Sequence, residues 1–336
     1  MGLKFTDLES WQKWQDSRRR LHVLKDRLTK RPRSASTAAP AMTFWARGDE
    51  PKLLVACDSN SPTNHHSLLG PLASVSSLPA VVVQPSHVQL QLPGEGWRQL
   101  PEDAAVRTVD TLASIGDHLA VGAWAHGVAR TRNWRQVVVQ HGLLTPYSPP
   151  PPHGVEWLAW SDADAEYVTQ GRPDLSARVT GSALLAAAAA DPAPHISRFE
   201  TPVFLGQLHG AELPRWQMTR SVTEFWRRTG ALYRPHPREE DKLSRIQHAL
   251  WRKAGMRFDE SPGLAALNHP VVGAFSTGVL EAAARGIPAW VFHINPPAWL
   301  EELWERYAMS SWGSAPTHFS TSHSDAAGRV AGRFYA

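Results

Sequence analysis

Short, uninterrupted apolar runs recur along most of this 336-residue chain and constrain its fold more than any other feature. Each run is too short for a buried helix and ends in polar, Gly or Pro residues. Strands of a parallel sheet have this composition, because helices cover both faces of such a sheet. We expect these strands at residues 52–58, 80–85, 118–124, 136–140, 155–160, 178–182, 202–206, 231–233, 271–275 and 288–292. The fold class is therefore predicted to be α/β.

Helical segments fit between these runs, and we expect them at residues 106–115, 163–170, 221–229, 239–254 and 279–285. An Ala-rich tract with following prolines, at 183–195, interrupts the alternation and indicates a domain boundary. Two α/β halves suggest two Rossmann-like domains facing a central cleft. The expected parts are an N-terminal helix within 1–34, domains at 42–190 and 196–320, and a C-terminal tail at 321–336 that packs back or is disordered.

Composition limits the environment of the protein. Cys57 is its one cysteine, so no disulfide can form within the chain, and a reducing cytoplasm fits best. No apolar segment approaches the roughly 20 residues that span a bilayer. The formal net charge of +4 favours anionic partners such as phosphates, acidic glycans, nucleic acid or a membrane face.

Residues 4–30 have apolar side chains at helical spacing, including Trp11 and Trp14, on an otherwise strongly basic segment. A basic amphipathic helix of this kind can lie on an acidic membrane surface. The alternative is a helix that packs on the protein body with its basic face in solvent.

His236 lies just after the run expected to form the 231–233 strand, and Pro235 and Pro237 fix the backbone around it. Ligands of open α/β sheets bind at the carboxyl ends of the strands. Arg234 adds a permanent planar cation suited to phosphate. The alternative is a buried His beside an Arg in a surface ion pair with Glu239 or Glu240.

A second anion site is predicted where the 271–275 strand leads into a helix. Ser276 and Thr277 offer hydroxyls at a positive helix terminus, and Gly278 lets a ligand approach the backbone. Glu281 follows one turn later and could accept the two hydroxyls of a ribose. The alternative is an ordinary helix cap with a solvated Glu281. Gly206, at the end of the 202–206 run, is expected to border the same nucleotide.

His141 ends a strand in the first half, and we expect it to project into the cleft as a general base. His209 has no partner at ligand spacing and is expected to be a surface residue. The sequence contains no GxGxxG, Walker-A or GxSxG motif, which weakens dehydrogenase, NTPase and hydrolase readings.

At these residues the chain resembles the GT-B glycosyltransferases. It is most similar to bacterial surface-polymer enzymes: polysialyltransferases, capsule transferases and the CDP-glycerol glycerophosphotransferases. Those families carry a His-Pro motif, matched by His236-Pro237, and a Ser-rich helix start that binds nucleotide phosphates, matched by Ser276-Thr277. Gln140-His141-Gly142 is similar to the base-bearing motif of the glycerophosphotransferases.

The resemblance implies a transferase that moves a sugar or polyol-phosphate unit from a nucleotide donor, with cytidine favoured, to a glycan or lipid-linked acceptor. His141 would deprotonate the acceptor, and no divalent metal, cofactor or nucleic-acid partner is expected. Two alternatives remain open. One is a nucleotide-sugar epimerase of the same architecture, and the other is a non-enzymatic binder of anionic surfaces that uses the basic N-terminal segment.

Overall fold

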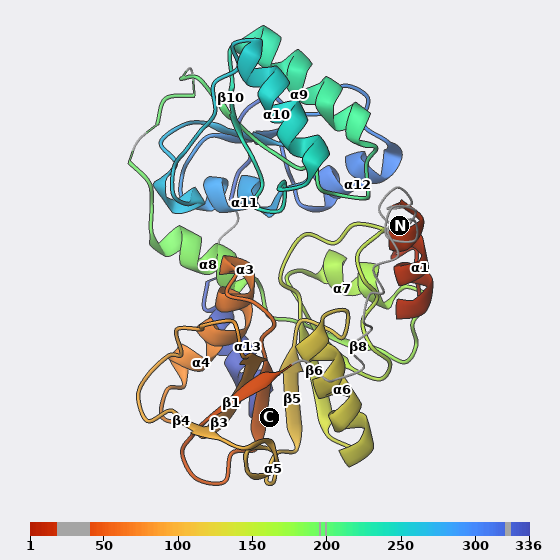
Figure 1. Ribbon diagram of the computed structural model, residues 1–336, viewed down its shortest axis with the longest axis vertical. Coiled ribbons are helices and arrows are strands. Elements are labelled where there is room, and N and C mark those ends of the chain that lie inside the picture. The colour runs from red at the N-terminus through yellow and green to blue at the C-terminus, as the bar shows by residue number, and fades with distance from the viewer. Residues whose placement is uncertain (19–40, 195, 199, 320–323) are drawn as a thin grey trace. The chain divides into compact units, whose positions relative to one another are not determined.

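The computed structural model describes residues 1–18, 41–194, 196–198, 200–319 and 324–336 (Figure 1). It has a mixed α/β fold with parallel sheets and helices between the strands. The chain divides into two compact units. The N-terminal unit comprises Gly2–Gly142, Pro146–Leu184 and Ser322–Ala336, and the C-terminal unit comprises Met1, Leu143–Thr145 and Leu185–Thr321. The domain limits that the sequence predicts, 42–190 and 196–320, stay predictions.

The N-terminal unit is built on an eight-stranded sheet of order β4-β1-β3-β2-β5-β6-β7-β8. From β3 to β8 the neighbours are parallel, whereas β1 is antiparallel to both β3 and β4. The strands are β1 (Met42–Arg47), β2 (Leu53–Ala56), β3 (Ala80–Pro85), β4 (Arg98–Leu100), β5 (Thr111–Ser114), β6 (Arg135–Val139), β7 (Glu156–Ala159) and β8 (Ser176–Val179). The order of the parallel strands reverses between β2 and β5, which is a doubly wound topology.

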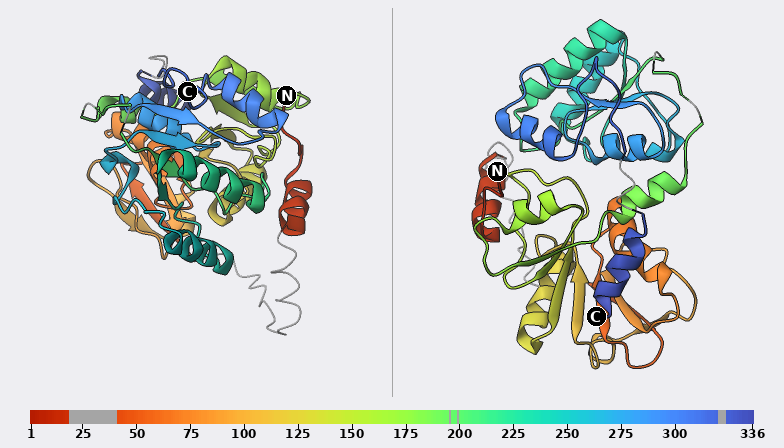
Figure 2. Two further views of the ribbon diagram at one scale, coloured as in Figure 1. Left: turned by 90° about the horizontal axis from the view of Figure 1, so that it is seen from above. Right: turned by 180° about the vertical axis from the view of Figure 1, so that it is seen from behind.

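Helices cover this sheet on both faces, as the sequence pattern requires (Figure 2). Alternate residues of one strand enter different cores: Leu53 of β2 packs in one apolar cluster and Leu54 in the other. The helical segments are α1 (Leu8–Arg18), α3 (Pro62–Asn64), a π-helical turn η1 (His65–Leu69), α4 (Gly70–Ser74), α5 (Glu102–Ala105), α6 (Ala120–Arg132), α7 (Asp162–Thr169) and α13 (Ala326–Phe334).

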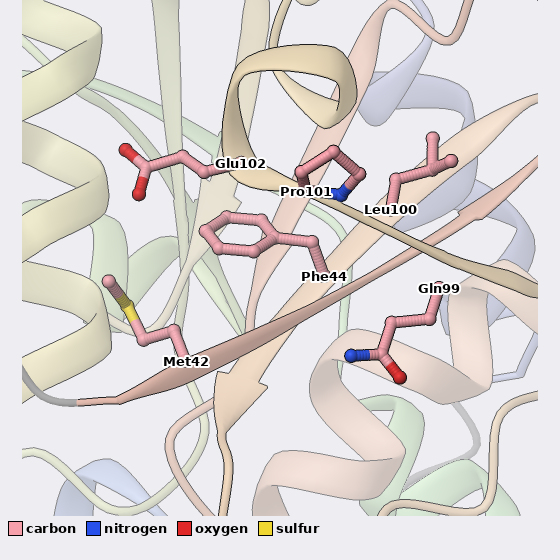
Figure 3. A pocket seen from close by; sticks show the side chains of 6 residues that line it. All are labelled: Met42, Phe44, Gln99, Leu100, Pro101 and Glu102. Carbon is pink, nitrogen blue, oxygen red and sulfur yellow. The ribbon is translucent and has the colours of Figure 1, made fainter.

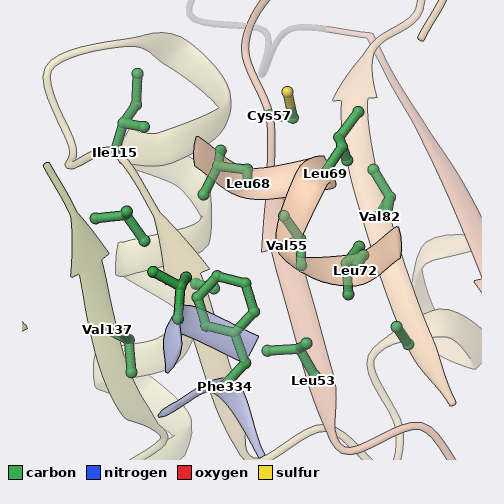
Figure 4. Packing of buried hydrophobic residues seen from close by; sticks show 14 of the residues in the cluster. Leu53, Val55, Cys57, Leu68, Leu69, Leu72, Val82, Ile115, Val137 and Phe334 are labelled. Carbon is green, nitrogen blue, oxygen red and sulfur yellow. The ribbon is translucent and has the colours of Figure 1, made fainter. Parts of the chain in front are cut away.

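The C-terminal segment completes the core of the N-terminal unit. Phe334 of α13 is 1% exposed and packs in one cluster with Leu53, Val137 and the turn that carries Leu68 (Figure 4). Arg329 of the same helix donates from Nε to the carbonyl of Thr180 at 2.8 Å. Helix α13 therefore packs on the sheet of the N-terminal unit.

Two expected elements of the N-terminal unit are wrong. Residues 118–124, expected as a strand, begin helix α6, and residues 106–115, expected as a helix, contain strand β5. The carboxylate of Asp58 accepts hydrogen bonds from Val121 N at 2.7 Å and Gly122 N at 3.0 Å, which satisfies the first turn of α6. This cap comes from a residue distant in sequence, so local pattern could not reveal it.

Helix α1 begins later than expected and packs on the N-terminal unit. Trp11 is 7% exposed and donates from Nε1 to the carbonyl of Tyr147 at 2.7 Å. The ring of Trp14 stacks on the Tyr147 ring with centroids 4.9 Å apart. The rest of the expected 4–30 helix, with most of its basic residues, lies outside the described residues.

The C-terminal unit has a parallel four-stranded sheet of order β10-β9-β11-β12. Its strands are β9 (Val203–Leu205), β10 (Leu232–Arg234), β11 (Val271–Gly273) and β12 (Ala289–Val291). Its helical segments are α9 (Arg215–Thr229), α10 (Lys242–Lys253), a 3₁₀ turn η2 (Leu264–Ala266), α11 (Thr277–Ala284) and α12 (Ala298–Arg306). Helix α8 (Ala183–Ala190) forms from the Ala-rich tract, which was expected to mark a boundary. Among the described residues, no helix is long and apolar enough to cross a bilayer.

Candidate functional site

The strand order of the C-terminal unit reverses between β9 and β11, and ligands of open α/β sheets bind beyond the strand ends at such a point. The loop after β9 and the turn after β11 meet here. Gln207 accepts a hydrogen bond at Oε1 from Phe275 N at 3.0 Å. A Cβ placed on Gly210 would lie 3.6 Å from the Phe275 ring, so the loop lies against the turn. The turn after β11, where the sequence predicts a phosphate site at Ser276 and Thr277, therefore lies at the switch point of the sheet.

Two histidines lie face to face at the ends of β9 and β10. The rings of His209 and His236 stack with centroids 3.9 Å apart and planes 22° apart. His209, expected to be a surface residue, is half-buried, and its Nδ1 is buried without a hydrogen-bond partner among the described residues. No sequence spacing signals this pair, because its members come from different strands.

Both histidines are held neutral at pH 7. Burial, followed by the charges of His236 and Arg238, lowers the pKa of His209 to about 3. Burial, followed by the charge of Arg238, lowers the pKa of His236 to about 4. The Nδ1 of His236 accepts a hydrogen bond from Arg238 N at 3.1 Å, so the neutral ring carries its proton on Nε2. His236 can therefore donate one hydrogen bond to an anion.

Arg238 is a cation that the sequence analysis missed. Its side chain is exposed, and its charge acts on His209, His236 and Glu212. Arg234, expected to bind phosphate, has its Nη1 in an ion pair with Asp259 and donates to the carbonyl of Ser261 at 2.9 Å. It pairs with neither Glu239 nor Glu240. Of the two arginines, Arg238 is the one near the stacked rings.

The first turn of α11 presents hydroxyls and backbone donors. Ser276 is the N-cap residue, and its Oγ accepts a hydrogen bond from Gly278 N at 3.2 Å. Within the described residues, neither its O–H nor the Thr277 hydroxyl has an acceptor. A Cβ on Gly278 would lie 2.8 Å from Leu205 Cδ1, so glycine is required for packing on β9. The ordinary cap and an anion site are both compatible with this geometry.

Glu281, one turn further along α11, has an unusual electrostatic environment. Burial raises its pKa to about 7, and its carboxyl group has no hydrogen-bond or ion-pair partner among the described residues. Burial also raises the pKa of Glu212, in the loop that carries His209. With its pKa near 7, Glu281 is poised to exchange a proton near neutral pH.

Glu239 is a buried hydrogen-bond acceptor that holds the loop next to His209 in place. Its Oε2 accepts from the hydroxyl of Tyr233 at 2.8 Å and bonds to Nε2 of His248 at 2.9 Å, and its Oε1 accepts from Leu208 N at 2.9 Å. A Cβ on Gly206 would lie 2.7 Å from this Oε1. Packing thus explains the glycine that was expected to border a nucleotide.

His141 lies in the N-terminal unit, directly after β6. It is half-buried, and burial lowers its pKa to about 4. Its ring is nearly parallel to that of His118, with centroids 6.3 Å apart, and its Nδ1 has no hydrogen-bond partner within the described chain. The side chain is neutral at pH 7 and has a nitrogen able to accept a hydrogen bond.

A Ser-His-Gln relay in the same unit is structural. Gly116 N donates to Ser114 Oγ at 3.1 Å, Ser114 Oγ lies 2.8 Å from His126 Nε2, and His126 Nδ1 lies 2.7 Å from Gln136 Oε1. Since an amide oxygen only accepts, His126 donates from Nδ1 and accepts from Ser114. Ser114 and His126 are both 0% exposed, so no substrate reaches this serine.

Two other kinds of site are not supported. A surface hollow of about 540 Å³ against β1 and β4 is lined by Met42, Phe44 and four neighbours, and Glu102 is its one charged residue (Figure 3). It has no acid–base pair. Among the residues that the structure describes, no group of three or more His, Cys, Asp or Glu side chains could hold a metal ion.

No protein-family pattern and no curated protein matches this sequence. Among solved structures, the chain is similar to the UDP-GlcNAc 2-epimerase from Methanocaldococcus jannaschii. The two are 10% identical, and the similarity covers 84% of this chain and 98% of the other, with a TM-score of 0.45.

Proposed function

We propose that this protein is a transferase that uses a nucleotide-activated donor, and that the C-terminal unit binds the donor's diphosphate or monophosphate. The observation that supports this most is the stacked His209–His236 pair beside Arg238, at the end of the same sheet whose switch point carries the hydroxyl-capped α11. Backbone and hydroxyl donors at a helix N-terminus bind phosphate oxygens well.

Each residue of the candidate site has a proposed role in donor binding. Ser276 and Thr277 donate hydroxyl hydrogens to phosphate oxygens, with Gly278 allowing close approach. His236 donates from Nε2 as negative charge develops on the leaving phosphate. Arg238 supplies the positive charge, while Arg234 holds the loop through Asp259. Glu281 accepts the ribose hydroxyls.

The chemical step requires a base, and His141 is the proposed one. Its neutral imidazole takes the proton of the acceptor hydroxyl, and the acceptor oxygen forms a bond to the donor's sugar carbon or polyol-phosphate phosphorus. The bond from that atom to the nucleotide phosphate oxygen breaks, and the nucleotide leaves with the electron pair. The acceptor is a glycan or a lipid-linked unit, and a cytidine nucleotide is the first donor to test.

A thermal-shift panel of CMP, CDP, UDP and GDP tests nucleotide binding without knowledge of the acceptor. A ligand that binds only the folded protein raises the melting temperature. At a ligand concentration one hundred times the dissociation constant, the folded state gains about 2.7 kcal/mol of stability. We expect one nucleotide to raise the melting temperature of the wild type and to lose most of that effect in Ser276→Ala. No shift with any of the four would refute the proposal.

An epimerase is the second candidate, and the raised pKa values of Glu212 and Glu281 favour it. A carboxyl group that titrates near neutral pH, as that of Glu281 does, suits proton removal from and return to a sugar carbon. Incubation with a nucleotide sugar and no acceptor separates the two: a new epimer supports this candidate, and an unchanged nucleotide sugar supports transfer.

A further inference from the structure

Helices α9 and α10 lie side by side on the C-terminal unit (Figure 1). Both helices expose large apolar side chains to solvent. Trp251 of α10 donates from Nε1 to Thr223 of α9 at 3.0 Å, which fixes their mutual packing. The inner face of α10 carries the buried residues Ser244, His248 and Trp251.

The outer face of α10 has an aliphatic stripe. Leu243, Ile246 and Leu250 are 54%, 48% and 56% exposed, and their spacing of three and four residues places them in one row. Trp216 of α9 is 63% exposed. No other described helix of the chain exposes three large aliphatic side chains in a row. A folded unit gains nothing by placing them in water.

Cations surround this stripe. Helices α9 and α10 together contain eight Arg and Lys residues and one acidic residue, Glu224, which is paired with Arg228. A groove of about 800 Å³ beside the stripe is lined by residues of both helices, including Arg220 and Arg227 on one side and Gln247 on the other. On a helical projection, Arg245 and Lys253 lie beyond the stripe from Gln247. Positive charge therefore borders the apolar row on both flanks.

We propose that the α9–α10 face, defined by Trp216, Leu243, Ile246 and Leu250 with the flanking Arg and Lys residues, docks on an anionic lipid surface. Aliphatic side chains enter the boundary of the acyl chains, Trp216 lies at the headgroup level, and the cations contact lipid phosphates. The charge pattern decides the occupant, because a second copy of this face would bring like charges together. This surface differs from the basic N-terminal segment and does not depend on the proposed transferase activity.

The test uses the full chain and vesicles of phosphatidylcholine, prepared with and without about 30% phosphatidylglycerol. We expect the wild type to sediment with the anionic vesicles, and less so as salt rises from about 0.1 M to 1 M. The triple variant Leu243→Ser, Ile246→Ser, Leu250→Ser should bind those vesicles about tenfold or more weakly. Because all three positions are exposed, the triple variant should fold like the wild type, and an unchanged melting temperature checks this.

Leu119→Ser with Val179→Ser is the matched control, since both residues are exposed on the N-terminal unit. It should bind like the wild type. Lys242→Gln with Arg245→Gln gives a second measurement, and it should weaken binding to anionic vesicles and flatten its salt dependence. Wild-type binding by the triple variant, equal binding to neutral vesicles, or a dimer that the triple variant dissociates would overturn the proposal.

Discussion

At the scale of single residues, buried acceptors and carboxyl groups explain how the candidate site is held. Glu239 bonds to three partners at once, and one of them is the backbone of the loop that carries His209. The sequence suggested Glu239, or Glu240, only in the alternative interpretation of Arg234, as a surface ion-pair partner, because burial of a carboxylate cannot be read from the charged residues around it. The sequence-predicted Arg234, His236, Ser276 and Thr277 lie at or just after strand ends. The placement of His209 and Glu239 depends instead on contacts between segments from different strands.

Removal of the Glu239 side chain should destabilise the protein markedly. Glu239→Ala leaves the Tyr233 hydroxyl, the His248 ring and Leu208 N without their buried partner, which costs about 3 kcal/mol. Urea unfolding measures this loss. Glu240→Ala, at the exposed next position, should change stability by about 0.5 kcal/mol or less. Equal losses of stability in the two variants would contradict the role of Glu239 as a buried acceptor of three hydrogen bonds.

The pKa of Glu281 makes a prediction about pH. Since its folded pKa, about 7, is above the ordinary 4.5, the folded state binds the proton more tightly than the unfolded state. The wild type therefore loses stability relative to Glu281→Gln as pH rises from about 4.5 to 7, by roughly 2 kcal/mol after allowance for partial exposure.

Urea unfolding at pH 4 and pH 8 checks this sign. We expect Glu281→Gln and the wild type to be equally stable at pH 4, and the variant to be more stable at pH 8. Glu305→Gln, an exposed change on α12, should show no such difference between the two pH values. A variant that is less stable than the wild type at pH 8 would show that the ionised Glu281 is stabilised instead.

At the scale of secondary structure, most strands of both units could be predicted, because parallel strands buried on two faces are continuously apolar. The segment at 118–124 has the same composition and still becomes helical, since the Asp58 carboxylate satisfies the first turn of α6. Strands β1 and β4 are antiparallel additions at the sheet edge, and their mixed residues carry no parallel-strand pattern.

Asp58→Ala should therefore weaken α6 specifically. Loss of a two-bond cap costs about 1–2 kcal/mol, and the affected amides are those of Val121 and Gly122. Chemical denaturation gives the total, and hydrogen exchange locates it at the start of α6. Asp49→Ala, at an exposed position before β2, serves as the comparison. Undiminished protection of α6 in Asp58→Ala would mean that the cap is unimportant.

At the scale of the whole molecule, the chain order and the two compact units do not coincide. The last segment, Ser322–Ala336, belongs to the N-terminal unit, and Phe334 fills its core. A sequence reading could place this tail only as packed or disordered, because the surface that receives it is assembled from strands far away in the chain.

Truncation after Thr321 should expose this core without removing any part of the C-terminal sheet. Hydrogen exchange should show faster exchange in β2, β5 and β6, and unchanged protection in β9 and β11. Gly332→Ala in the full chain, at an exposed helix position with open space around its Cβ, should leave both sheets protected. Retained protection of β2 after truncation would contradict the role of α13.

The central claim is that the switch point of the C-terminal unit binds the phosphates of a nucleotide. Calorimetric titration with CDP, or whichever nucleotide stabilises the protein most, tests it on the wild type, on His236→Ala and on His153→Ala, an exposed histidine of the N-terminal unit. We predict saturable binding by the wild type and His153→Ala, and a dissociation constant about tenfold or more higher for His236→Ala, the loss expected for one hydrogen bond to a charged group. Identical affinities for all three proteins, or none for the wild type, would contradict the account.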